Sequence, residues 1–156
     1  EEGKNPFIIG LDGLTDVRRF GAIARTCEVA GVDAIVIPSR GSVSVNADAI
    51  KTSAGALHTI PVCRENSLKE AILFLKNSGV KVVAASEKAA ELYTEADMSV
   101  PVAILMGSED VGIAAEYLRI SDELVKLPQV GNIKSLNVSV AAGVMIYEVL
   151  RQRRNQ

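Results

Sequence analysis

The chain has 156 residues, 48% of them hydrophobic and 23% charged, which is the length and composition of one globular domain with a buried core. Aromatic residues make up only 4%, which argues against a platform that stacks nucleic acid bases on many rings. The 17 basic and 19 acidic residues give a net charge of −2, which excludes a uniformly basic surface but not a local basic patch.

The cysteine and histidine content excludes several kinds of site. Cys27 and Cys63 lie in apolar segments without the spacing of metal ligands, and the single histidine, His58, leaves no His/Cys zinc cluster and no Ser-His triad. We therefore expect no metal and a reducing, cytoplasmic location. No apolar run approaches the roughly 18 residues that span a bilayer, so no membrane is expected as a partner.

Short apolar runs with the length of buried parallel strands recur along the chain. They comprise residues 6–12, 33–38, 60–64, 81–86, 101–107 and 123–128. Helical patterns separate these runs, and such alternation is typical of a parallel sheet with helices on both faces. We therefore predict an α/β fold with a parallel six-stranded sheet, in one domain over residues 1–156.

Apolar spacing and capping residues predict the helices. Apolar residues at i, i+3, i+4 and i+7 indicate a helix around residues 20–27. Asn46 is a candidate cap for a second helix that runs through Ala56, and Ser67 with Glu70 forms the capping box of a third. A last long helix is predicted from about residue 135 to 153.

Ligands of open α/β sheets bind beyond the carboxyl ends of the strands, so the residues that follow the predicted strands are the most informative. Neither a G-x-G-x-x-G sequence nor a P-loop follows the first strand, which removes the strongest signals for a dinucleotide or a nucleoside triphosphate. Three other segments attract attention.

The first segment is the arginine-rich start of the first helix, residues 16–26. Arg25 lies off the apolar stripe, so its guanidinium can point into a cleft. Arg18 and Arg19 stand where the helix dipole disfavours cations, a placement that makes sense if they face an anion. A solvated arginine cluster on an amphipathic helix accounts for the same residues equally well.

The second segment, residues 103–113, is an apolar strand that breaks into a turn with two glycines. Such a turn lets backbone groups approach a ligand closely, and Glu109 supplies a carboxylate at the strand end. A plain strand-to-helix turn capped by Ser108 or Asp110 has the same local sequence.

The third segment, residues 127–143, passes from a strand through a glycine-containing loop into a helix of small residues. The small residues 141–143 permit close backbone approach, as a tight helix contact or a dimer seam requires, and Val140, Val144 and Ile146 supply apolar surface for a dimer. Ser135 and Asn137 put polar groups where a structural helix would prefer Leu or Glu. Capping is expected to explain Ser135 but not Asn137.

In these three segments the chain resembles the SpoU/TrmH family of RNA 2′-O-ribose methyltransferases of the SPOUT superfamily. The motifs GAIARTCEVAG, ILMGSEDVGI and LPQVGNIKSLNVSVAAGVMIYE stand in the family's order and spacing, and the resemblance covers essentially the whole chain. The sequence NADAIKTSAGALHTIPVCR further resembles the branch that methylates a guanosine of large-subunit rRNA, more than the tRNA branch.

The resemblance implies S-adenosylmethionine as cofactor, RNA as substrate, a homodimer and a deep C-terminal trefoil knot, an exception to the rule that chains do not thread loops. Family members often carry a separate N-terminal RNA-binding domain, which we do not expect within these residues. The implied catalytic residues are Arg25, Glu109, Ser135 and Asn137. The implied cofactor-binding residues are Ala85, Met106, Gly107, Leu127, Gly131 and Leu136. The cations nearest the first motif are the candidate RNA contacts besides Arg25: Arg18, Arg19, Arg40 and Lys51.

The implied chemistry leaves the role of Arg25 open. A ribose 2′-hydroxyl must lose its proton as it attacks the methyl group, and arginine accepts a proton only if its pKa falls steeply. Arg25 is thus either the base or the group that orients a phosphate while phosphate or water takes the proton.

One residue departs from the family pattern. Arg19 stands where the family usually has Asn, and arginine only donates hydrogen bonds and adds charge. We predict that Arg19 contacts RNA; the competing structural interpretation is an ion pair with Asp16 or Glu109. The alternatives to an rRNA methyltransferase are a tRNA methyltransferase and a catalytically weakened relative that binds RNA or the cofactor.

Overall fold

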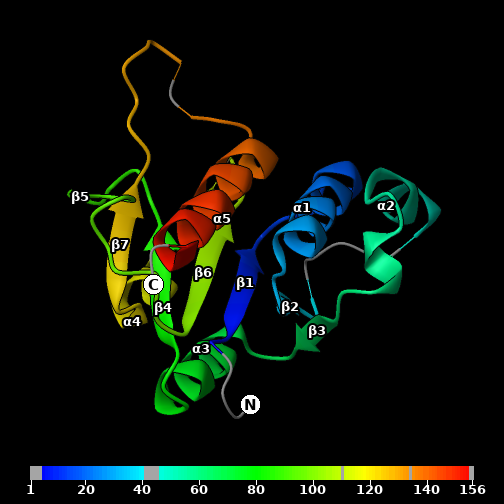
Figure 1. Cartoon of the computed structure of the whole chain (residues 1–156), viewed down its shortest axis with the longest axis horizontal. Helices are drawn as coiled ribbons and strands as arrows, with labels where there is room; N and C mark the ends of the chain where they lie inside the picture. The colour runs from blue at the N-terminus through cyan, green and yellow to red at the C-terminus, as the bar shows by residue number, and fades with distance from the viewer. Residues whose placement is uncertain (1–4, 41–45, 110, 134, 155–156) are drawn as a thin grey trace.

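The computed structural model describes residues 5–40, 46–109, 111–133 and 135–154, and it shows a sheet between two layers of helices (Figure 1). The strands are β1 (Phe7–Asp12), β2 (Ala34–Pro38), β3 (Val62–Glu65), β4 (Lys81–Ala85), β5 (Glu91–Leu92), β6 (Val102–Gly107) and β7 (Glu123–Lys126). The helices are α1 (Val17–Ala30), α2 (Ala47–Thr52), the 3-10 turn η1 (Ala56–His58), α3 (Leu68–Asn77), α4 (Ala115–Ile120) and α5 (Val138–Arg154).

The sheet is parallel, as predicted, but the described residues form seven strands and not six, in the order β3-β2-β1-β6-β4-β7-β5. The six predicted strands are confirmed to within two residues at each end. The additional strand, β5, has only two half-buried residues, which is too short for any apolar pattern to reveal. It forms because Glu91 and Leu92 pair with the end of β7 at the edge of the sheet.

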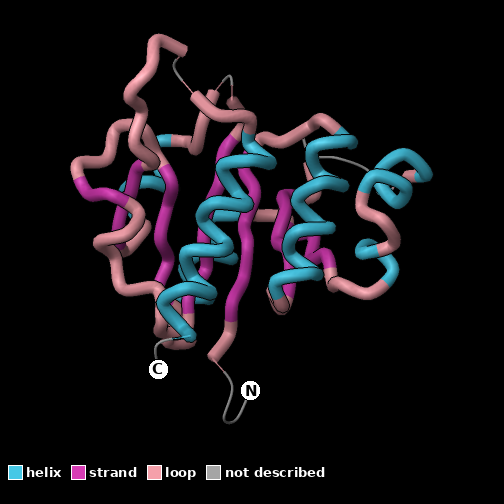
Figure 2. The backbone as a smooth tube through the Cα atoms, turned by 45° about the horizontal axis from the view of Figure 1, so that its top comes forward, coloured by secondary structure: helices cyan, strands magenta, loops and turns pink. Residues whose placement is uncertain are grey.

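Alternation along the strands builds the two cores that the fold class requires. In β1, Phe7, Ile9 and Leu11 belong to the core shared with α1 and α5, whereas Ile8 faces the opposite core with α3 and α4. Figure 2 shows α1 and α5 side by side on one face of the strands. Among the described residues, no helix has both the length and the apolar character that crossing a membrane requires.

Two predicted helices have different limits in the structure. The helix capped by Asn46 ends at Thr52, because Ala54 and Gly55 adopt left-handed φ angles of 55° and 89°. The last helix begins at Val138 and not near Ser135.

The last turn of α5 is fastened to the amino ends of the central strands. Arg153 donates hydrogen bonds to the backbone oxygens of Asn5, Pro6 and Val100 at 2.8–3.1 Å, and its guanidinium lies 5.3 Å from the centre of the Phe7 ring. These contacts fix the far end of α5 while its first turn reaches the carboxyl edge of the sheet.

A buried carboxylate in α5 leads to a prediction about acid stability. The Glu148 side chain accepts two hydrogen bonds of 2.8 Å from Arg151, which lower the pKa of Glu148 below its usual value. A lowered folded-state pKa adds stability above the unfolded pKa of about 4.3, and this contribution is lost as pH falls through the folded value. We expect Glu148→Gln to destabilise the protein by about 1 kcal/mol at pH 7 and to lose less stability on acidification.

Urea unfolding at pH 7 and at pH 3.5 measures this difference, with the exposed carboxylate variant Glu116→Gln as control. Equal acid destabilisation of Glu148→Gln and the unaltered protein would contradict the assignment.

Candidate functional site

The carboxyl ends of β6, β4 and β7 surround a cleft of about 200 Å³, at the edge of the sheet where the strands end. Parallel register brings these ends together, since Ala84 pairs with Leu105 and Ala85 with Val125. The cleft is lined by residues 85–88, 106–109, 111–113, 118, 127–129, 135, 136, 138 and 141. These residues come from segments far apart in sequence, and the position agrees with the rule for open α/β sheets.

The turn after β6 is folded tightly against itself. A Cβ on Gly107 would lie 2.3 Å from the carbonyl carbon of Gly112 and 2.5 Å from the amide nitrogen of Ile113, so only glycine fits. The Gly112 amide donates to Ser108 O at 2.8 Å, and the Ala114 amide donates to the Asp12 carboxylate at 2.8 Å. Ser108 Oγ also accepts from the amide of Val111 at 3.3 Å, as a turn cap does. Asp110, the other candidate cap, lies outside the described residues.

Five of the six predicted cofactor-binding residues line this one cleft: Ala85, Met106, Gly107, Leu127 and Leu136. Gly131 does not line it, because the exposed residues 129–133 that follow β7 project beyond the ends of the strands (Figure 1). A Cβ on Gly131 would meet nothing within 4 Å.

The structure brings together two of the four predicted catalytic residues, since Glu109 and Ser135 both line the cleft. Asn137 is a helix cap, which corrects the expectation that capping would not explain it. Its Oδ1 accepts from the Ser139 amide at 2.9 Å, and its carbonyl accepts from Ala141 at the start of α5. Arg25 is exposed on α1 and is absent from the lining of its own chain's cleft.

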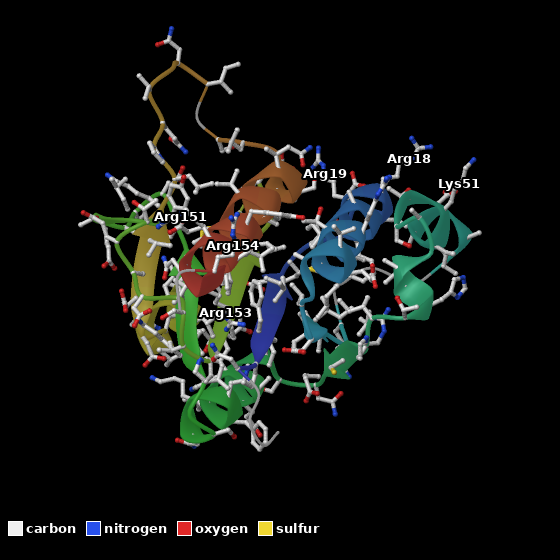
Figure 3. All side chains as sticks on the ribbon, in the orientation of Figure 1. Arg18, Arg19, Lys51, Arg151, Arg153 and Arg154 are labelled. Atoms are coloured by element: carbon white, nitrogen blue, oxygen red, sulfur yellow. The ribbon has the colours of Figure 1, made fainter. Side chains whose placement is uncertain are left out.

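The predicted RNA contacts divide into two groups. Arg18, Arg40 and Lys51 are exposed, and Figure 3 shows Arg18 and Lys51 extending outward above α1 and α2. Arg19 instead forms ion pairs with both Glu109 and Asp16. This is the structural alternative that the sequence left open.

Sequence reasoning missed several polar residues of the cleft, namely Ser86, Glu87, Lys88 and Gln129. The available signal was positional, because these residues directly follow β4 and β7 at the edge where ligands bind. Their side chains add one cation and one further carboxylate to the lining.

Comparison with known proteins relates this chain to RNA methyltransferases. The sequence model of the SpoU rRNA Methylase family matches residues 6–147. The 23S rRNA (guanosine-2'-O-)-methyltransferase RlmB of Shewanella oneidensis is 40% identical over 96% of this chain and 61% of that protein.

Solved structures of this kind share the fold. The AdoMet-bound rRNA methyltransferase from Sinorhizobium meliloti is 31% identical with a TM-score of 0.87, over 97% of this chain and 57% of that one. The A. aeolicus TrmH/SpoU tRNA modifying enzyme is 28% identical with a TM-score of 0.87, over 99% of this chain and 79% of that one. The present chain spans 61% of the RlmB protein's length. From the first strand to the last helix, the chain belongs to the SpoU rRNA methylase family.

Proposed function

We propose that this chain is the catalytic domain, residues 1–156, of an enzyme that transfers a methyl group from S-adenosylmethionine to a ribose 2′-hydroxyl of 23S rRNA. The observation that carries the proposal is the convergence of Ala85, Met106, Gly107, Leu127 and Leu136 on one cleft. The name of the Shewanella oneidensis relative supports a guanosine of 23S rRNA as the target.

The residues of the cleft fit this cofactor. Gly107 lets the turn after β6 close against its own backbone beside the cleft, and the side chains of Met106, Leu127 and Leu136 offer an apolar wall for an adenine ring. Lys88 and Glu87 offer charges for the carboxylate and the ammonium group of the methionine moiety. When bound, S-adenosylmethionine supplies a methyl group on a positively charged sulfur.

The chain's own residues would then position the ribose. Glu109 and Ser135 lie in the cleft lining, where a hydroxyl of the nucleotide can form hydrogen bonds with them. Arginine remains protonated in proteins, so we propose that Arg25 binds the phosphate beside the target nucleotide. The hydroxyl proton would pass to phosphate or water. Asn137 would act indirectly, by fixing the first turn of α5 beside Ser135.

RNA would be held by a few exposed cations, because the net charge of the chain is −2. Arg18, Arg40 and Lys51 are exposed and available for phosphates. A small number of phosphate contacts gives weak, salt-sensitive binding.

We propose a homodimer formed through the shared face of α1 and α5. On α5, Val140, Val144 and Tyr147 are 52%, 36% and 49% exposed, and Val29 on α1 is 67% exposed. Arg25 lies one turn before Val29 on the same side of α1, so pairing of two copies would place it at the seam.

Not every residue of the predicted seam is free to pair. Ile146 and Ala142 are fully buried in the core of their own chain, which removes them from the face. The small side chain of Ala142 therefore serves packing of α5 within the chain.

We further propose a C-terminal trefoil knot, which the family relationship supports. We also propose a cytoplasmic location, because the proposed substrate, rRNA, lies in the cytoplasm.

The dimer proposal predicts that Val144→Glu yields a monomer. A carboxylate at the centre of a dry interface would be desolvated without a partner. Light scattering at micromolar concentration measures the mass. Phe74→Glu, which alters a 69% exposed residue of α3 on the other face, is the matched control and should remain dimeric. A monomeric unaltered protein would refute the proposal.

The function is tested by incorporation of a labelled methyl group into unmodified 23S rRNA and, separately, into unmodified tRNA. We expect rRNA alone to be labelled, and ribose 2′-O-methylation at one guanosine. Labelling of tRNA alone would favour the alternative substrate, to which the A. aeolicus tRNA modifying enzyme is the structural parallel. Cofactor binding without transfer to any RNA would identify a catalytically weakened relative.

A further inference from the structure

The Arg19 guanidinium lies between two carboxylates from distant parts of the chain. Arg19 Nη1 is ion-paired with Glu109 Oε1, and Arg19 Nε lies 3.7 Å from Asp16 Oδ2. Asp16 is fixed in place, because its Oδ1 accepts from the amides of Arg18 and Arg19 at 3.0 and 3.2 Å. The ion pair therefore joins the first turn of α1 to the turn that forms the cleft.

Glu109 depends on this contact. Its Oε1 is shielded from solvent, and within the described part of the chain Arg19 is the cation paired with it. A carboxylate oxygen removed from water needs a compensating charge. Arg19 thus holds the Glu109 carboxylate against α1, at the edge of the cleft.

Arg19 is at the same time accessible to an anion from outside. Its side chain is 40% exposed, against 24% for Glu109, and Arg18 beside it is exposed as well. A phosphate binds a guanidinium bidentately, with geometry at least as good as that of a carboxylate. An RNA phosphate and Glu109 would therefore compete for one guanidinium.

We propose that Arg19 is a positioning residue shared in turn between Glu109 and an RNA phosphate. Without RNA, Arg19 holds the Glu109 carboxylate against α1 at the edge of the cleft; when RNA enters, a phosphate takes over Arg19, and the Glu109 carboxylate is released to bind the ribose. This inference rests on the proposed function, since it needs RNA as the substrate. It assigns Arg19 a role that a neutral Asn at this position could not fill.

If Arg19 passes from Glu109 to an RNA phosphate, removal of Glu109 and removal of Arg19 should change RNA affinity in opposite directions. In the absence of cofactor, Glu109→Gln should bind 23S rRNA transcribed in vitro about two- to fivefold more tightly, because Arg19 no longer has a competing carboxylate. Arg19→Gln should bind more weakly, and the slope of log affinity against log salt should fall by about one. The double variant should behave as Arg19→Gln alone. Filter binding at several salt concentrations measures all four proteins.

Three further variants distinguish the transfer of Arg19 from Glu109 to a phosphate from a general effect of charge on RNA binding. Glu87→Gln removes the same charge from another carboxylate of the cleft and should tighten RNA binding less than Glu109→Gln. Arg18→Gln should weaken RNA binding by the same factor with and without Glu109→Gln. Arg19→Lys should bind RNA more tightly than Arg19→Gln but less tightly than the unaltered protein, since lysine keeps the charge but lacks the planar guanidinium that binds a phosphate bidentately.

A purely structural ion pair gives a different result, in which Glu109→Gln leaves RNA affinity unchanged or lowers it. That result, or a double variant that differs from Arg19→Gln, overturns the inference while methyl transfer by the unaltered protein still supports the proposed function. If the unaltered protein neither binds nor methylates rRNA, the proposed function and the inference fall together.

Discussion

Replacing Gly107 by alanine is expected to weaken binding of S-adenosylmethionine by at least about 100-fold. The added Cβ would lie 2.3 Å from Gly112 C and 2.5 Å from Ile113 N, and both are backbone atoms that cannot rotate away. The turn after β6 must therefore move, and it forms the floor of the cleft together with Met106 and Glu109. A displacement of the backbone that contacts a ligand loses several interactions at once. Isothermal titration with S-adenosylmethionine measures the affinity.

The matched control is Gly21→Ala, which adds the same methyl group to α1 outside the cleft, where a Cβ would also be crowded, at 2.7 Å from Ala49 O. Cofactor affinity should be unchanged in this variant. Gly107→Ala should also lower the stability of the fold by about 1–3 kcal/mol, as overpacked sites do, so thermal unfolding must show that the variant is folded at the temperature of the titration. Normal cofactor affinity in Gly107→Ala would place the cofactor elsewhere.

Replacing Arg25 by alanine is expected to reduce methyl transfer by at least about 100-fold, because a nucleotide whose phosphate is no longer held leaves the in-line geometry that the reaction requires. Cofactor affinity should stay the same, because Arg25 does not line the cleft of its own chain. Its exposure means that no buried partner is left unsatisfied, so stability should change by less than about 0.5 kcal/mol. Single-turnover methyl transfer and cofactor titration on the same sample measure the two effects.

Arg18→Ala is the control for Arg25, because it removes another exposed arginine from the same helix. It should weaken RNA binding and leave the rate at saturating RNA close to normal. Arg25→Lys separates charge from geometry, since lysine restores a point charge without the bidentate fork. Full activity in Arg25→Ala would contradict the catalytic role, and loss of cofactor binding in the folded variant would contradict the division between cleft and substrate face.

The sequence determined the fold class through local periodicity. Runs of buried strand length and the capping box at Ser67 act within a few residues, and the structure confirms the box through the bond from the Glu70 amide to Ser67 Oγ at 3.1 Å. The same sequence did not reveal β5, because two residues carry no period and their pairing with β7 is a contact between distant segments.

The cleft at the carboxyl ends of the strands was predictable, because the family motifs name residues that line it and the parallel topology gathers strand ends at one edge. The contacts of Asn137, Arg19 and Arg25 depend on how their side chains are oriented in the fold, which the spacing of residues in the sequence does not encode. Only the helix start at Val138 made Asn137 a cap, and only the turn after β6 brought Glu109 to Arg19. Only the placement of α1 relative to the cleft left the exposed Arg25 out of the lining of its own chain. Local patterns fix elements, whereas side-chain partners are decided by which elements come to lie beside one another.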